Sequence, residues 1–315
     1  MIKINLSINQ IERINSIIDN DIDSFLWKGY NECVLEVLRS NKLTQTLELI
    51  GTKEKLKENC KIFGRKKLLA FGNKVKTVFE IESANNLTIK EKIKKEFTKQ
   101  YTNFSHRACA YEILSIINAS VCPYCNRLYT FTVEEGKKTR PEFDHFYSKD
   151  DYPWLAISIY NLIPSCGICN KSKSSKDTIN LLYPYEESFE EYDIHFNLID
   201  TVPLLLDEMN IKKKRLVKMC SKNADASRII NKHNNCFKLE DIYNEHREFI
   251  IDLIKRIYIF NDDCIESIYQ SYNDIIDDID DLRSMSLGTL PYHDYLNTPL
   301  AKLTNDLIEQ MLYDD

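Results

Sequence analysis

Residues 161–170 read NLIPSCGICN, and residues 122–125 read CPYC. Each stretch contains a Cys-x2-Cys pair, in which two intervening residues allow both sulfur atoms to turn onto one ion. Two such pairs predict a tetrahedral zinc site whose four ligands are Cys122, Cys125, Cys166 and Cys169. All four thiolates would bind the same Zn2+, so this ion would stabilise the fold and would take no part in a reaction.

Two other interpretations of the cysteines are weaker. A redox Cys-x2-Cys motif needs only one pair, on a βαβ frame, and chance pairing of buried cysteines would not be expected to repeat the same spacing. The remaining six cysteines are scattered singly, and we expect them to be small buried residues: Cys33, Cys60, Cys109, Cys220, Cys236 and Cys264.

Composition and charge narrow the class of protein. The 315 residues include only 7 Gly and 8 Pro, and long stretches of Leu, Ile, Lys and Glu favour a mostly helical chain. The net charge of −6 is not that of a protein that coats nucleic acid. The charge is uneven, however, because residues 51–99 carry many Lys and Arg while residues 261–315 are acidic. The basic segment is a candidate nucleic-acid path or partner surface.

The predicted fold class is α+β, mostly α-helical, in three regions. Residues 1–119 are expected to form a helical N-terminal region, 120–185 a small core with the cysteine pairs, and 186–315 a helical C-terminal region. Within these regions the patterns predict short strands at 71–81 and 127–133, a helix at 210–222, and a closing helix with Thr298 near its N-cap and Pro299 in its first turn.

No stretch of the sequence predicts a membrane segment. The N-terminal residues MIKINLSINQIERINS lack the apolar region of a signal peptide, and no run reaches about 18 apolar residues. We therefore expect a cytoplasmic protein without a membrane span, in which cysteines remain reduced.

The stretch from 120 to 178 resembles a known family. The segments CPYC, PEFDHFYSK and YPWLAISIYNLIPSCGICNKSKS are similar, in that order, to the HNH or ββα-metal nucleases in their zinc-knuckle form. The resemblance implies a β-hairpin with Asp144 and His145 on the first strand and Asn161 on the second. The helix that follows would carry Asn170, where some relatives have His.

Phosphodiester hydrolysis explains the residue types. Asp144 and Asn170 offer oxygen atoms to a catalytic Mg2+ or Mn2+, and His145 is free to deprotonate water. The resemblance implies that Asn161 does not bind the metal but ties the hairpin loop and orients His145. Taken alone, the same residues would be a surface pair, a turn residue and a helix cap.

Basic residues around this stretch are candidate phosphate contacts. They are Arg140, Lys149, Lys171, Lys173 and Lys176. A solvated helix face is an equally good interpretation of the lysines that follow Cys169.

A second resemblance covers much of residues 120–315. The segments YPWLA, FKLEDIYNEHREFI and TPLAKLTNDLIEQ are similar to HNH proteins of Septu-type and some retron-linked bacterial anti-phage systems. It implies an SMC-like ATPase partner and a nuclease that acts as the effector of a defence complex, on DNA rather than RNA. Two alternatives remain: an RNase, for instance one that cuts tRNA, and an inactive zinc-containing module that binds nucleic acid or a partner.

Overall fold

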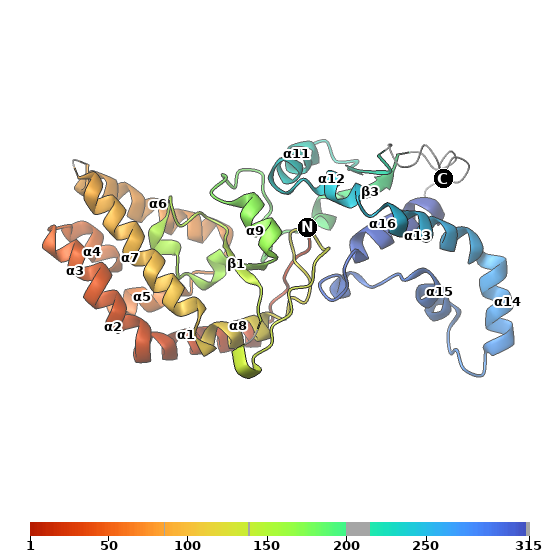
Figure 1. Cartoon of the computed structure of the whole chain (residues 1–315), viewed down its shortest axis with the longest axis horizontal. Helices are drawn as coiled ribbons and strands as arrows, with labels where there is room; N and C mark the ends of the chain where they lie inside the picture. Colours follow the sequence, from red (N-terminus) through yellow and green to blue (C-terminus); the bar gives the residue numbers. More distant parts are fainter. Residues whose placement is uncertain (85, 138, 200–214, 313–315) are drawn as a thin grey trace. The chain divides into compact units, whose positions relative to one another are not determined.

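The computed structural model describes residues 1–84, 86–137, 139–199 and 215–312 (Figure 1). This part of the chain is mostly helical and contains two small antiparallel sheets, as the composition predicts. It divides into two compact units. The larger unit consists of Lys3–Tyr124 and Tyr129–Glu187; the smaller unit consists of Met1–Ile2, Cys125–Leu128 and Ser188–Asp315.

Helices form most of the larger unit. The first begins at a capping box. The Ser7 hydroxyl accepts a hydrogen bond from the Gln10 backbone N–H, and the Gln10 side-chain oxygen accepts one from the Ser7 backbone N–H. The helices are α1 (Ile8–Asp21), α2 (Trp27–Gly29), α3 (Glu36–Ser40), α4 (Thr44–Ile50), α5 (Lys53–Cys60), α6 (Arg65–Glu82), α7 (Leu87–Ser105), α8 (Ala108–Ile117) and α9 (Gly167–Lys173), with π-helical turns at Ile22–Leu26 and Tyr30–Leu35. No helix in the described part of the chain is long and apolar enough to cross a bilayer.

A short hairpin precedes α9. Strand β1 (Glu142–His145) pairs antiparallel with β2 (Leu162–Ser165), so that Asp144 lies opposite Ile163 and His145 opposite Leu162. The connecting segment 146–161 contains two 3-10 turns, Pro153–Leu155 and Ile159–Asn161. Strand, strand and helix therefore follow one another in the order that the sequence predicts.

Helix α6 lies close against the connecting segment. The Trp154 indole Nε1 donates a hydrogen bond of 3.0 Å to the Gly72 carbonyl, and the Phe79 ring meets the indole edge-on. A Cβ atom on Gly72 would lie 3.0 Å from the Tyr152 ring, so a larger residue here would require the Tyr152 ring to shift. These contacts bury Trp154 and Leu155 and fix the segment that connects the two strands.

The smaller unit contains the second sheet. Strand β3 (His195–Leu198) pairs antiparallel with β4 (Val217–Cys220), and α16 packs against β3. The helices are α11 (Ala226–Phe237), α12 (Leu239–Asn244), α13 (Arg247–Ile259), α14 (Asp262–Tyr272), α15 (Ile279–Leu287) and α16 (Ala301–Leu312).

Four expected elements differ in the described residues: two have the other type of secondary structure, one strand is reduced to bridges, and one helix begins later than expected. Residues 71–81 belong to α6, because Leu68, Val75 and Phe79 bury one helical face. The strand expected at 127–133 reduces to two isolated bridges. Residues 217–220 of the helix expected at 210–222 form β4, and residues 210–214 lie outside the described part. The closing helix begins at Ala301, after Leu300 with a positive φ of 62°.

A buried cluster of charges joins α16 to β3. The Lys302 ammonium is 3.0 Å from both Asp306 and Glu190, and only 1% of its side chain is exposed. His195 contacts Asp306 at 3.3 Å and Asp193 at 2.9 Å through its two ring nitrogens. The bond to Asp306, and secondarily that to Asp193, raises the pKa of His195 to about 9 against the opposing effect of burial.

This raised pKa predicts pH-dependent stability of the smaller unit. The His195 contribution should be complete below its unfolded pKa of about 6.5 and should disappear as the pH rises through about 9. Urea unfolding of wild type and His195→Gln should therefore differ most near pH 6 and converge near pH 10. The matched control is His293→Gln, because His293 is exposed. A constant difference across this range would contradict the assignment.

Candidate active site and metal centre

The four paired cysteines come together as predicted. The sulfur atoms of Cys122, Cys125, Cys166 and Cys169 all lie within 4.8 Å of one another, and all four residues are buried. A zinc ion about 2.3 Å from each sulfur requires sulfur–sulfur separations of about 3.8 Å, which this grouping allows. The Cys166 sulfur also caps α9, accepting a 3.4 Å hydrogen bond from the Cys169 amide. The chain thus has a buried four-cysteine cluster that could hold a metal such as zinc.

Asp144 is buried and already bound. Its carboxylate accepts a 2.6 Å hydrogen bond from the Tyr124 hydroxyl and lies 3.1 Å from the Lys173 ammonium. Lys173 also donates a 2.6 Å hydrogen bond to the His145 carbonyl oxygen. Burial raises the pKa of the Asp144 carboxyl, and the Lys173 ammonium is the main opposing influence. Lys173 is fully buried. The prediction that it contacts phosphate is therefore wrong, because such a contact would have to lie on the surface.

His145 points to a different environment from Asp144, as neighbours on a strand do. Its Nε2 is 3.0 Å from the Ala156 carbonyl oxygen, and its ring meets Tyr101 edge-on with centroids 4.5 Å apart. Burial lowers the pKa of His145 to about 3, so the ring is neutral at pH 7. A carbonyl oxygen only accepts, so we assign the ring proton to Nε2 and the free lone pair to Nδ1.

Asn161 lies at the end of the 3-10 turn before β2 and not on the second strand, where it was expected, and its side chain ties the connecting segment. Its amide oxygen accepts from the Tyr147 backbone at 2.8 Å, and its amide nitrogen donates to Tyr147 at 3.0 Å and Leu155 at 3.2 Å. Leu155 precedes Ala156, whose carbonyl meets His145. Asn161 is fully buried. By holding Leu155, it fixes the position of the neighbouring Ala156 carbonyl, which orients the His145 imidazole.

Asn170 contacts a residue that the sequence did not single out. Its amide nitrogen donates a 2.7 Å hydrogen bond to Glu142, an exposed carboxylate two residues before Asp144 on β1. Strand alternation places Glu142 and Asp144 on one face, a signal by which Glu142 could have been found. In the described part of the chain no hydrogen bond joins the side chains of Asp144, His145 and Asn170, and Lys173 connects Asp144 only to the backbone of His145. The expected convergence of these three groups is not evident from their contacts.

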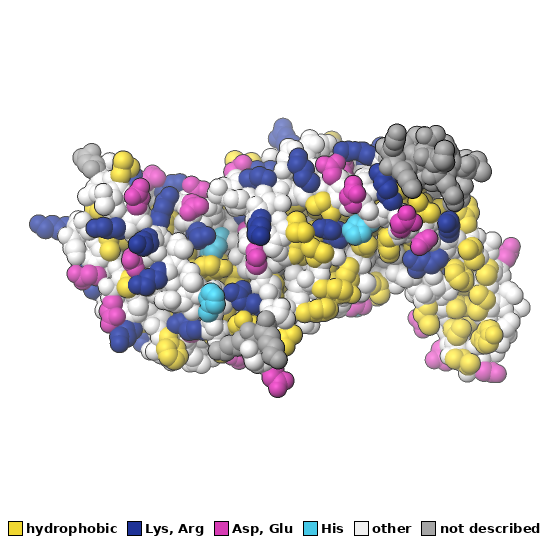
Figure 2. Space-filling model, viewed as in Figure 1, with side chains coloured by type: hydrophobic (Ala, Val, Ile, Leu, Met, Phe, Trp, Pro, Cys, Tyr) yellow, Lys and Arg dark blue, Asp and Glu magenta, His cyan; other side chains and the backbone are white. Residues whose placement is uncertain are grey.

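The other basic candidates are more accessible. Lys171 and Lys176 are exposed, and Lys149 is half-buried. Arg140 is half-buried, with its guanidinium over the rings of Tyr111 at 5.8 Å and Phe143 at 5.4 Å. Figure 2 shows Lys and Arg side chains interspersed with Asp and Glu on the visible face, and not gathered into one patch.

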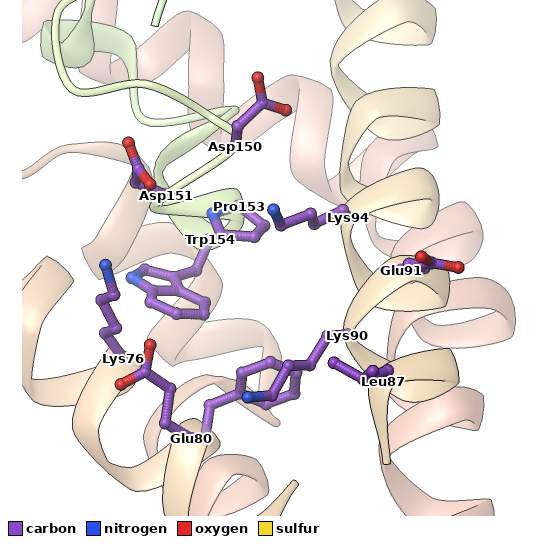
Figure 3. A pocket seen from close by; sticks show the side chains of 11 residues that line it. Lys76, Glu80, Leu87, Lys90, Glu91, Lys94, Asp150, Asp151, Pro153 and Trp154 are labelled. Atoms are coloured by element: carbon purple, nitrogen blue, oxygen red, sulfur yellow. The ribbon is translucent and has the colours of Figure 1, made fainter. Parts of the chain in front are cut away.

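The basic N-terminal segment contributes to a pocket of about 320 Å3. Figure 3 shows Lys90 and Lys94 reaching from α7 toward its interior, with Lys76 on the opposite wall. Trp154 forms part of the lining. Because Trp154 is two residues before Ala156, this pocket borders the segment that orients His145.

The cysteine cluster predicts one bound zinc per chain. Cys166→Ser removes one zinc ligand but keeps a side chain that can cap α9, so the variant should lose most of its zinc and, without the ion, unfold more readily. Metal content by plasma mass spectrometry and thermal unfolding test this, with Cys264→Ser, a residue outside the cluster, as the control. A Cys166→Ser protein that keeps a full equivalent of zinc would rule out the predicted ligand set.

Comparison with protein-family models, with curated proteins and with solved structures finds no match for this chain. What the chain does must therefore be inferred from its own residues and their contacts.

Proposed function

We propose that the chain is an HNH-type endonuclease that hydrolyses phosphodiester bonds in nucleic acid. The observation that carries the proposal is the state of His145. It is a neutral imidazole whose Nε2 is held by a backbone carbonyl, on a hairpin followed by a helix that Cys166 caps and that contains Cys169, two members of the buried cluster. This order of strand, strand and helix is the one that the family resemblance implies.

The chemistry assigned to His145 is general-base catalysis. Nδ1 accepts a proton from water, the resulting hydroxide attacks phosphorus, and the bond from phosphorus to the leaving oxygen breaks. A lowered pKa keeps the ring unprotonated but makes it a weak base. An anionic phosphate beside the ring favours the imidazolium and so raises the pKa of His145 when substrate binds.

A catalytic Mg2+ or Mn2+ would neutralise the phosphate and the leaving oxygen. The proposed ligands fit such an ion only in part. Asn170 and Glu142 are accessible and offer oxygen atoms. Asp144, by contrast, is bound by the Lys173 ammonium, which would repel a divalent cation. Asp144 can serve as a ligand only if Lys173 moves.

The proposal includes the substrate and the protein complex in which the nuclease acts. The loosely similar anti-phage proteins suggest DNA as substrate and an SMC-like ATPase as partner in a defence complex. An RNase that acts on tRNA remains an alternative, because the residues assigned to the reaction need no 2′-hydroxyl. The pairing of Asp144 with Lys173 favours a second candidate, a binding module that does not cut.

Replacing His145 tests the enzyme directly. His145→Ala should reduce nicking of supercoiled plasmid, or cleavage of RNA, by at least about 100-fold in Mg2+ or Mn2+, and EDTA should stop the wild type. His106→Ala is the control, because His106 is exposed at the end of α7. Equal cleavage by His145→Ala would exclude this base, and no cleavage by wild type would favour the binding module.

Replacing Lys173 tests Asp144 as a metal ligand. Lys173→Met leaves a buried carboxylate without its cation and should lower the free energy of unfolding by about 3–5 kcal/mol. If Asp144 can bind a divalent ion, added Mn2+ should restore part of this stability to the variant and leave wild type unchanged. Lys171→Met, on the exposed side of the same helix, should change stability by less than about 0.5 kcal/mol. Unfolding that is insensitive to Mn2+ would remove Asp144 from the ligand set.

A further inference from the structure

A small uncharged pocket lies between the end of α8 and the extended segment 129–133. Its volume is about 140 Å3, roughly that of four or five water molecules, which suits one planar ring system. Five polar side chains line it, one of which, Thr130, donates its hydroxyl to the Ala119 carbonyl oxygen. Within the described ranges the other four have no hydrogen-bonding partner for their side chains: Ser115, Asn118, Ser120 and Thr132. The pocket therefore offers hydroxyl and amide groups that are free to recognise a ligand.

An exposed pair of aromatic rings adjoins this pocket. Tyr129 and Phe131 stack with centroids 4.5 Å apart and planes 18° from parallel, yet they are 55% and 53% exposed. Phe131 also lines the pocket. Phe25, Tyr258 and Tyr272 are as exposed, so it is the stacking of two rings beside a pocket, and not exposure alone, that points to a ligand. An aromatic face beside neutral hydrogen-bonding groups is the arrangement that holds an unstacked base in proteins that bind single strands.

The charges around the pocket fit the same class of ligand. No Asp, Glu, Lys or Arg is among the lining residues, so the part of a ligand that enters it is uncharged. One cation lies on the same helix face: Arg140 sits over Tyr111, and Tyr111 is one helical turn before Ser115 on α8. A polymer with neutral rings and anionic links could place a ring in the uncharged pocket and an anionic link beside Arg140.

We propose that this pocket binds one unpaired nucleobase of the substrate, stacked on Phe131, with Arg140 close to the adjoining phosphate. The inference rests on the proposed function, which makes nucleic acid the polymer. It deepens that function by assigning the enzyme a substrate that is single-stranded, at least at one position. A sugar ring, the other ligand suited to aromatic and hydroxyl groups, is distinguished by the experiment below.

Binding is measured without cleavage, in the His145→Ala background and without added Mg2+ or Mn2+, so that no chelator removes the zinc. The probes are short fluorescent DNA and RNA oligonucleotides in three forms: single-stranded, single-stranded with abasic positions, and fully paired. Phe131→Ala should weaken single-strand binding by about 5- to 100-fold, and Phe131→Trp should retain it. Abasic strands should bind the parent as weakly as intact strands bind Phe131→Ala. Duplex binding should not respond to Phe131→Ala.

Val133→Ala is the matched control, because Val133 is exposed on the same side of the segment and does not line the pocket. Three outcomes overturn the inference: no binding of single strands, unchanged binding by Phe131→Ala, or equal binding of abasic strands, which would indicate a sugar or backbone site. Failure of the two proposals is distinguishable. Wild type that binds strands but never cuts removes the nuclease alone. Wild type that cuts while Phe131→Ala binds normally removes the pocket alone.

Discussion

One buried ammonium group holds the centre of the larger unit together. Lys173 reaches from α9 to the Asp144 carboxylate and to the His145 carbonyl oxygen. An isolated charge in this environment would be strongly destabilising, so carboxylate and ammonium are stable only as a pair. Hairpin and helix are consequently fixed to each other. The backbone of His145 is held from one side, while its imidazole is free to contact a different part of the chain.

The orientation of His145 comes from the segment between the strands. Asn161 closes this segment through Tyr147 and Leu155, which places the Ala156 carbonyl against Nε2. A backbone carbonyl cannot donate, so it selects one tautomer of the ring and leaves the other nitrogen with its lone pair. A strong carboxylate partner would instead favour the imidazolium. The fold therefore presents a neutral histidine, which is the form that a base requires.

Sequence reasoning succeeded where the chemistry is local. The spacing of Cys122, Cys125, Cys166 and Cys169 specifies a cluster whatever surrounds it, whereas the order of strand, strand and helix was expected only from the family resemblance. It failed where burial decides. Lys173 was expected at the surface because lysine usually is, and only its contact with Asp144 explains its place. Residues 71–81 were wrongly expected to be a strand because the buried face of α6 begins at Leu68, outside that window. The short window alone does not show the helical period. Strand alternation alone would place Glu142 on the face of Asp144, but its contact with Asn170 depends on which face α9 covers.

The absence of a side chain at position 72 has a consequence far along the chain. Any larger residue there would push against Tyr152 and disturb the carbonyl that receives the Trp154 indole proton. Trp154 is two positions from the oxygen that holds His145. A methyl group added at position 72 of α6 would displace Trp154, and through the connecting segment it would displace the carbonyl that orients the imidazole. A substitution at position 72 would therefore reach His145 through Trp154 and the connecting segment.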